Sequence, residues 1–228
     1  GDILCAGDLS AEARMRDLIA ERKNSLQSAV VPSGHIFAKR AAGAGLSLPA
    51  YRDELWHGRT QFGFVKRQAG DFDELKTDLR GKMDALKALI FTRANLLINL
   101  TADAQGLALA EEQLARLLRR LPAGGNMAPH PQPELRPGRA GIAVPTQVSY
   151  VASVFKAPAY TDPAAAILML ASKELSNSYL YKHIRVQGGA YGGMSAFDFS
   201  MGLMAFLSYR DPHIVRTLDV FSAAAKFY

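Results

Sequence analysis

The stretch IRVQGGAYGG, residues 184–193, places an arginine, a tyrosine and four glycines directly after the longest helical pattern in the chain. The Arg185 guanidinium and the Tyr191 hydroxyl are donors that could bind a carbonyl or an oxyanion. The glycines permit positive φ and close approach of another backbone. A purely structural interpretation is also open, in which Gly188 and Gly189 cap the helix and Arg185 favours its negative end. On either interpretation the stretch predicts a helix that passes into a strand.

The residues on both sides of this junction predict an α+β fold. Thr161-Asp162-Pro163 has the pattern of a helix start, and the helix it opens runs toward Arg185. Beyond the glycines, residues 194–199 and 203–209 predict a hairpin, followed by a helix from Asp211. Upstream, the pattern predicts helices over 71–89 and 106–121, a buried strand over 93–101, a loop over 122–138, and strands over 142–144 and 148–155. We therefore expect an antiparallel sheet with helices packed on one face.

The first 70 residues predict helices alone. Apolar residues recur at helical spacing from Asp8-Leu9-Ser10 to about residue 30, a second helix follows Ser33, and a third covers Pro49 to His57. Residues 58–70 then change in character. We expect a domain boundary near Gly70, with residues 1–70 as the helical end of one α+β domain and residues 71–228 as a second, truncated one.

Composition excludes several classes of protein. Apolar residues make up 49% of the chain, enough for a sizeable core, but no run of about eighteen apolar residues predicts a membrane span. Cys5 is alone, so no internal disulfide can form. The net charge of +6 comes from scattered basic residues, which favours solvated helix faces over a nucleic-acid interface. The chain lacks an initiator methionine and ends at Tyr228 within a helical pattern, so we expect a fragment.

The sequence holds no complete catalytic motif. No two of its histidines lie within five residues of each other, so no H-E-x-x-H or H-x-x-E-H zinc motif can be written. A phosphate-binding G-x-x-x-x-G-K-[ST] loop and a G-x-S-x-G serine motif are absent too. We therefore expect no metal ligands in this chain and no self-sufficient enzyme.

Three segments resemble the pitrilysin-type (inverzincin) metallopeptidases, in the form of their presequence protease-like branch. Residues 184–192 resemble the arginine-and-tyrosine signature of the C-terminal half. Residues 144–151, VPTQVSYV, are similar to the preceding strand, with Ser149 where asparagine is more usual. Ser33-Gly34-His35, together with Arg40-Ala41 and later Gly58, is similar to the helical end of the third domain. The resemblance covers essentially the whole chain.

The resemblance implies a function that this chain shares with another part of a longer protein. In the family, the N-terminal half holds the catalytic zinc, and the two halves enclose a chamber for peptides. Arg185 and Tyr191 would be the catalytic residues of this chain, donating to the scissile carbonyl and the developing oxyanion, a type of help worth about 10²-fold per donor. Gly188, Gly189 and Gly192 would bind substrate by keeping the approach open.

The implied partners are unfolded or targeting peptides and the N-terminal half of the same polypeptide. The fragment alone should bind no zinc and cleave nothing, and its surface around Tyr191 should be open to solvent. The alternative is a non-catalytic scaffold subunit of the same superfamily. We expect a bacterial cytoplasm, with an organelle matrix as the alternative.

Overall fold

The computed structural model describes residues 7, 9–125 and 132–227, which form two compact units. The smaller unit lies within Gly1–Glu21 and Arg67–Pro131, and the larger within Arg22–Lys66 and Gln132–Tyr228. Helices α2 (Glu12–Ala29) and α5 (Arg59–Gly70) each continue from one unit into the other. The predicted helix start at Asp8 lies outside the described residues. The expected boundary between family domains near Gly70 stays a prediction, because compact units of this kind do not test it.

The smaller unit consists of helices. It contains the beginning of α2, α6 (Phe72–Ile90), the short 3-10 helix η1 (Arg93–Asn95) and α7 (Ala104–Arg120). Phe72 is buried, and the Arg16 guanidinium carbon lies 4.3 Å from its ring centre. Arg16 also pairs with Asp73 at 2.5 Å. The predicted helices over 71–89 and 106–121 are thus confirmed within a few residues.

The predicted buried strand over 93–101 is wrong. Only η1 is regular there, and residues 96–103 form no helix or strand. Leu97 is 95% exposed. The backbone N–H groups of Arg93 and Ala94 donate to the carbonyls of Pro122 and Ala123, so this segment's hydrogen bonds go to a loop. An apolar run forms a buried strand only if another strand pairs with it, and none of the described strands does so here.

The larger unit is built on a three-stranded antiparallel sheet of order β1-β3-β2. The strands are β1 (Ala152–Lys156), β2 (Gly192–Asp198) and β3 (Leu203–Tyr209). The predicted hairpin is confirmed: Gly202 takes φ +64° in its turn, and Asp198 accepts hydrogen bonds from Ser200 and the Met201 backbone. Residues 142–144, however, are irregular, which corrects the predicted strand there.

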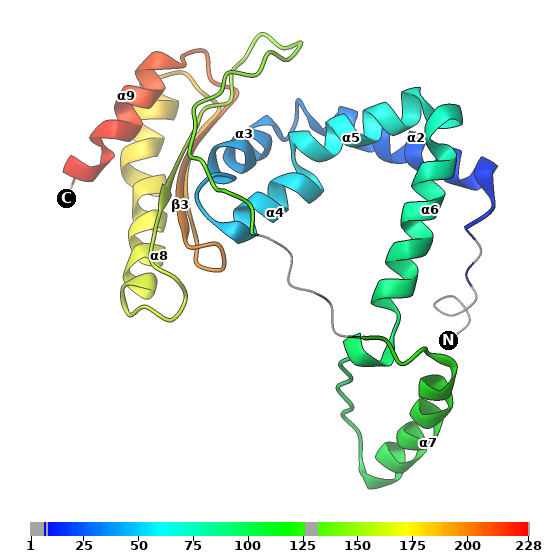
Figure 1. Ribbon diagram of the computed structural model, residues 1–228. Helices are drawn as coiled ribbons and strands as arrows, with labels where there is room; N and C mark the ends of the chain where they lie inside the picture. Colours follow the sequence, from blue (N-terminus) through cyan, green and yellow to red (C-terminus); the bar gives the residue numbers. More distant parts are fainter. Residues whose placement is uncertain (1–6, 8, 126–131, 228) are drawn as a thin grey trace. The chain divides into compact units, whose positions relative to one another are not determined.

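The expected α+β fold, an antiparallel sheet with packed helices, is confirmed. The helices α8 (Ala164–Leu175), η2 (Ser176–Val186) and α9 (Val215–Ala223) lie on one face of the sheet (Figure 1). The other face has a cover that the sequence did not indicate. Helix α3 (Gly34–Gly43) lies there: a Cβ at Gly43 would lie 3.2 Å from Leu203, and Lys39 pairs with Asp198 at 3.4 Å. The helix predicted after Ser33 therefore finds its apolar partner within this chain.

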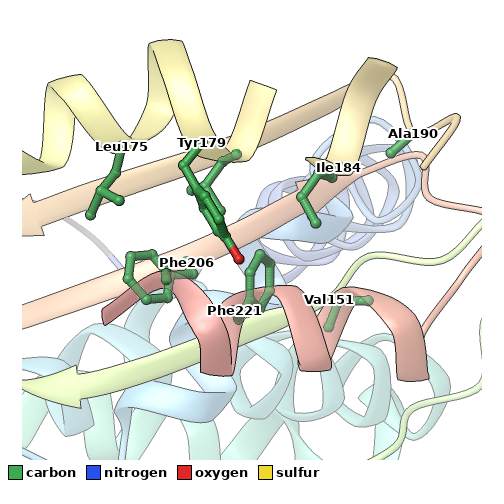
Figure 2. Close-up of a cluster of buried hydrophobic side chains, with 9 residues drawn as sticks. Val151, Leu175, Tyr179, Ile184, Ala190, Phe206 and Phe221 are labelled. Carbon is green, nitrogen blue, oxygen red and sulfur yellow. The ribbon is translucent and has the colours of Figure 1, made fainter. Parts of the chain in front are cut away.

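The core of the larger unit lies between the sheet and the helices α8, η2 and α9 (Figure 2). Tyr179 of η2 points between Phe206 of β3 and Phe221 of α9, and its hydroxyl donates to the Val220 carbonyl at 3.0 Å. Burial raises the pKa of the Tyr179 phenol. Leu180, on the same helix, has no exposed surface. This packing fixes η2, and with it the residues at its end, on the sheet.

Two further predicted helices are also observed. The third helix is confirmed as α4 (Leu48–His57), capped by Ser47, whose hydroxyl accepts from the Ala50 backbone. The last helix begins at Val215 rather than Asp211, because the Asp211 carboxylate turns inward to accept from the His213 backbone and the Thr217 hydroxyl. The segment 58–70, for which the sequence indicated only a change in character, contains helix α5.

Candidate functional site

The candidate site lies where η2 ends and β2 begins. η2 continues α8 without a break, but its eleven residues form a π-helix, where the pattern predicted an α-helix throughout. π-Helical segments are rare and frequently lie at functional sites. A Cβ at Gly193 would lie 2.7 Å from Ile184 Cβ and 2.9 Å from the Leu180 carbonyl oxygen. The helix can therefore rest directly on β2 because Gly193 has no side chain.

Gly188 and Gly189 form the end of this helix. Gly189 takes φ +76° and donates to the Arg185 carbonyl at 3.0 Å, and Ala190 donates to the Ile184 carbonyl at 3.1 Å. A Cβ at Gly188 would lie 2.4 Å from that same Ile184 oxygen. The two glycines are therefore required by the cap itself. At Gly192 the nearest atom to an added Cβ is Tyr209 Cβ, at 4.0 Å, so this position is open.

The structure brings Arg185 and Tyr191 together on the surface. The guanidinium carbon of Arg185 lies 5.5 Å from the Tyr191 ring centre and 5.6 Å from that of Tyr181. Tyr191 is 63% exposed. Arg185 forms no ion pair with any carboxylate of the described residues. Its charge is therefore positioned by two aromatic rings and remains available to a ligand.

The row of interacting side chains extends beyond the two residues that the sequence singled out. The Tyr191 ring lies edge-on to Tyr209, with centroids 5.7 Å apart, and the Arg210 guanidinium carbon lies 5.5 Å from the Tyr209 ring centre. We call Tyr181, Arg185, Tyr191, Tyr209 and Arg210 the Arg–Tyr row. Sequence reasoning missed three of its members. Tyr181 could have been found, because it precedes Arg185 by four residues on a helix. Tyr209 and Arg210 are brought in by strand pairing, which the local pattern does not specify.

Side chains of α3 and of the segment before β1 pack against the row. His35 lies edge-on to Tyr209 at 4.9 Å, and burial lowers the pKa of its imidazole. Tyr150 lies 5.7 Å from Tyr209, and its hydroxyl donates to the Val31 carbonyl. Gly34 lies against the Tyr150 ring so closely that a Cβ there would be 2.3 Å from it. Tyr209 is thus held by tightly packed neighbours.

The chemistry available here is that of hydrogen-bond donors. Arg185 and Tyr191 can donate to a carbonyl or an oxyanion, as a substrate-binding surface requires. Over residues 7, 9–125 and 132–227, no three His, Cys, Asp or Glu side chains come together in a group that could hold a metal ion, so these residues do not fit a zinc site. None of the helices in this part of the chain is both long and apolar enough to cross a membrane.

Comparison with known proteins gives matches at both ends of the chain. The family model described as "PreP C-terminal domain" matches residues 140–228, and a second model, described as a peptidase-associated domain, matches residues 1–67. Relatives include "Presequence protease 1, chloroplastic/mitochondrial" of Arabidopsis thaliana, at 28% identity over 95% of this chain and 20% of the relative. The mitochondrial presequence proteases of Kluyveromyces lactis and Saccharomyces cerevisiae are each 27% identical, over 99% and 94% of this chain and 24% and 23% of their own. The chain thus spans about a fifth to a quarter of the length of these curated relatives.

These relatives overturn the expected compartment. The expectation of a bacterial cytoplasm is wrong, because the relatives are mitochondrial or chloroplastic proteins, which points to an organelle matrix. The expectation rested on an alanine- and arginine-rich composition. Such a composition suits the surface of a folded domain in either compartment and carries no address.

Proposed function

Because the chain belongs to the presequence protease-like family and matches the C-terminal part of its members, we propose that it is the substrate-contacting part of a zinc peptidase. In this proposal Arg185 and Tyr191 donate hydrogen bonds to the scissile carbonyl of a peptide. The metal would belong to another part of the polypeptide, since the residues described here do not form a site for it.

One observation carries the proposal: the guanidinium of Arg185 lies beside two tyrosine rings without a carboxylate partner among the described residues. A donor that is already in place needs no reorganisation when charge develops on the substrate oxygen. The phenol of Tyr191, which is protonated at neutral pH, adds a second donor beside it. Gly192 leaves the surface next to Tyr191 open, as an extended peptide would need.

The substrates we propose are unfolded or targeting peptides, in keeping with the word presequence in the relatives' names. The other partner would be the remaining, larger part of the same polypeptide, since the relatives are about four to five times as long as the region they share with this chain. In the absence of that part, this chain would not cleave peptides.

The test uses the full-length protein that contains this chain. Arg185→Gln and Tyr191→Phe should each lower peptide turnover by about 10²-fold, the typical effect of one lost donor, with zinc content unchanged. Arg216→Gln is the matched control, because Arg216 is an exposed arginine of α9 and not a member of the row. Turnover at the wild-type level in both row variants would refute the proposal.

A non-catalytic scaffold subunit of the same superfamily is the second candidate. The matched family models speak for it, because one is a C-terminal domain and the other an associated domain. The well-packed sheet, covered on both faces, would suit such a role. In that case the full-length protein lacks H-x-x-E-H, and Arg185→Gln changes neither peptide turnover nor assembly with a catalytic partner.

A further inference from the structure

Arg210 lies in a β-bulge that the hairpin itself does not need. Ser208 donates to the Val151 carbonyl, and Asp211 and Ser149 exchange a pair of backbone hydrogen bonds. Between these two bonded positions, Tyr209 and Arg210 stand opposite the single residue Tyr150. One residue is therefore extra, and Arg210 takes φ +50° to accommodate it. Bulges of this kind redirect side chains and are frequent beside active sites.

The side chain at this position lowers stability. A residue with a Cβ is strained at positive φ, whereas glycine is not. Among the described residues, Arg210 is the one non-glycine residue with positive φ. A glycine would complete the bulge at lower cost, so an arginine here points to a use for the guanidinium.

The guanidinium of Arg210 has no acid to neutralise it among the described residues, and it lies against the Tyr209 ring. The adjacent Asp211 is 1% exposed and committed to the His213 backbone and the Thr217 hydroxyl. The Arg210 carbonyl accepts from the Tyr191 backbone at 3.4 Å. The bulge thus places a second, unneutralised cation next to Tyr191 in the Arg–Tyr row.

We propose that Arg210 is a specificity-determining residue that binds a carboxylate of the peptide, beside the segment held by Arg185 and Tyr191. This inference rests on the proposed function. A planar guanidinium binds a carboxylate through two parallel hydrogen bonds, which a neutral amide cannot reproduce. The carboxylate could be an acidic side chain or the C-terminus of the peptide, and both present the same chemistry to Arg210.

The experiment measures kcat and KM of the full-length protein with four peptides of one parent sequence. The parent has a glutamate and a free C-terminus, and the others carry glutamine, a C-terminal amide, or both. For Arg210→Gln we expect kcat/KM to fall roughly tenfold through KM with the peptides that keep the recognised carboxylate. With the fully neutral peptide it should stay unchanged. The peptide whose single change already abolishes the difference identifies the source of the carboxylate.

Two variants separate this role from a structural one. Arg210→Gly should lose the same preference while raising Tm, because it relieves the strain at positive φ. Arg216→Gln serves as the control for loss of a positive charge. An equal loss with charged and neutral peptides, or no loss with either, would overturn the inference.

Arg185→Gln tests the proposed function separately, since it should lower turnover of all four peptides alike. If Arg185→Gln has no effect, the proposed function fails. If it acts on all peptides and Arg210→Gln shows no preference for charge, only the inference about Arg210 fails.

Discussion

At the scale of single residues, the adjacent glycines 192 and 193 offer a matched comparison. A Cβ at Gly193 would lie 2.7 Å from Ile184 Cβ, whereas one at Gly192 has no atom nearer than Tyr209 Cβ at 4.0 Å. Gly193→Ala should therefore lower the free energy of unfolding by about 1–3 kcal/mol, the usual cost of overpacking. Gly192→Ala should change it by less than about 0.5 kcal/mol. Urea unfolding of both variants measures the difference, and equal midpoints would contradict the close approach of η2 to β2.

Tyr181 supports a prediction about positioning. Its ring centre lies 5.6 Å from the Arg185 guanidinium carbon. Tyr181→Leu should lower turnover by the full-length protein about 2- to 5-fold, the worth of an exposed cation–π contact. Tyr181→Phe keeps the aromatic ring and should retain nearly full turnover. In an Arg185→Gln background, Tyr181→Leu should have no further effect, and an additive loss there would show that Tyr181 acts by another route.

At the scale of elements, the contact between α3 and the sheet should depend on pH. Burial lowers the pKa of the His35 imidazole below its ordinary value of about 6.5. The unfolded chain then binds the proton more tightly, so this contribution to stability is complete above about pH 6.5 and falls as the pH drops through the folded pKa. Denaturant midpoints at about pH 7.5 and about pH 5 should differ less for His35→Phe, which keeps an aromatic ring and removes the titration. An unchanged difference would assign the acid sensitivity to other groups.

Most elements followed from local pattern because their signals are local. Asp162 marks the start of α8, where its carboxylate accepts from the Ala164 backbone at 2.8 Å, and Gly202 marks the hairpin turn. What the sequence could not indicate depends on distant residues. Leu97 is as apolar as a core strand residue, and only the absence of a pairing strand among the described residues leaves it 95% exposed. The cover on the second sheet face comes from α3, which is far from β1 in sequence.

The candidate site shows the same division between local and long-range information. Gly188 and Gly189 were recognisable as a helix cap, and the structure places both of them in it. The proximity of Tyr191 to Arg185 followed from their spacing. Arg210 could not be found, because its place beside Tyr191 depends on the β2–β3 register and on the bulge opposite Tyr150. Whether these residues contact a substrate stays a prediction.

At the scale of the whole molecule, a division of labour follows from the proposal: this chain supplies donors, and another part of the polypeptide supplies the metal. We therefore predict that this chain alone is indifferent to zinc. A metal that binds the folded state raises its stability in proportion to the logarithm of its concentration. The described residues bring no three ligand side chains together, so neither added zinc nor a chelator should shift the Tm of the chain. The full-length protein should instead lose peptide turnover with the chelator and regain it with zinc. A zinc-dependent rise in the Tm of this chain by itself would contradict the division, and would place metal ligands within these 228 residues.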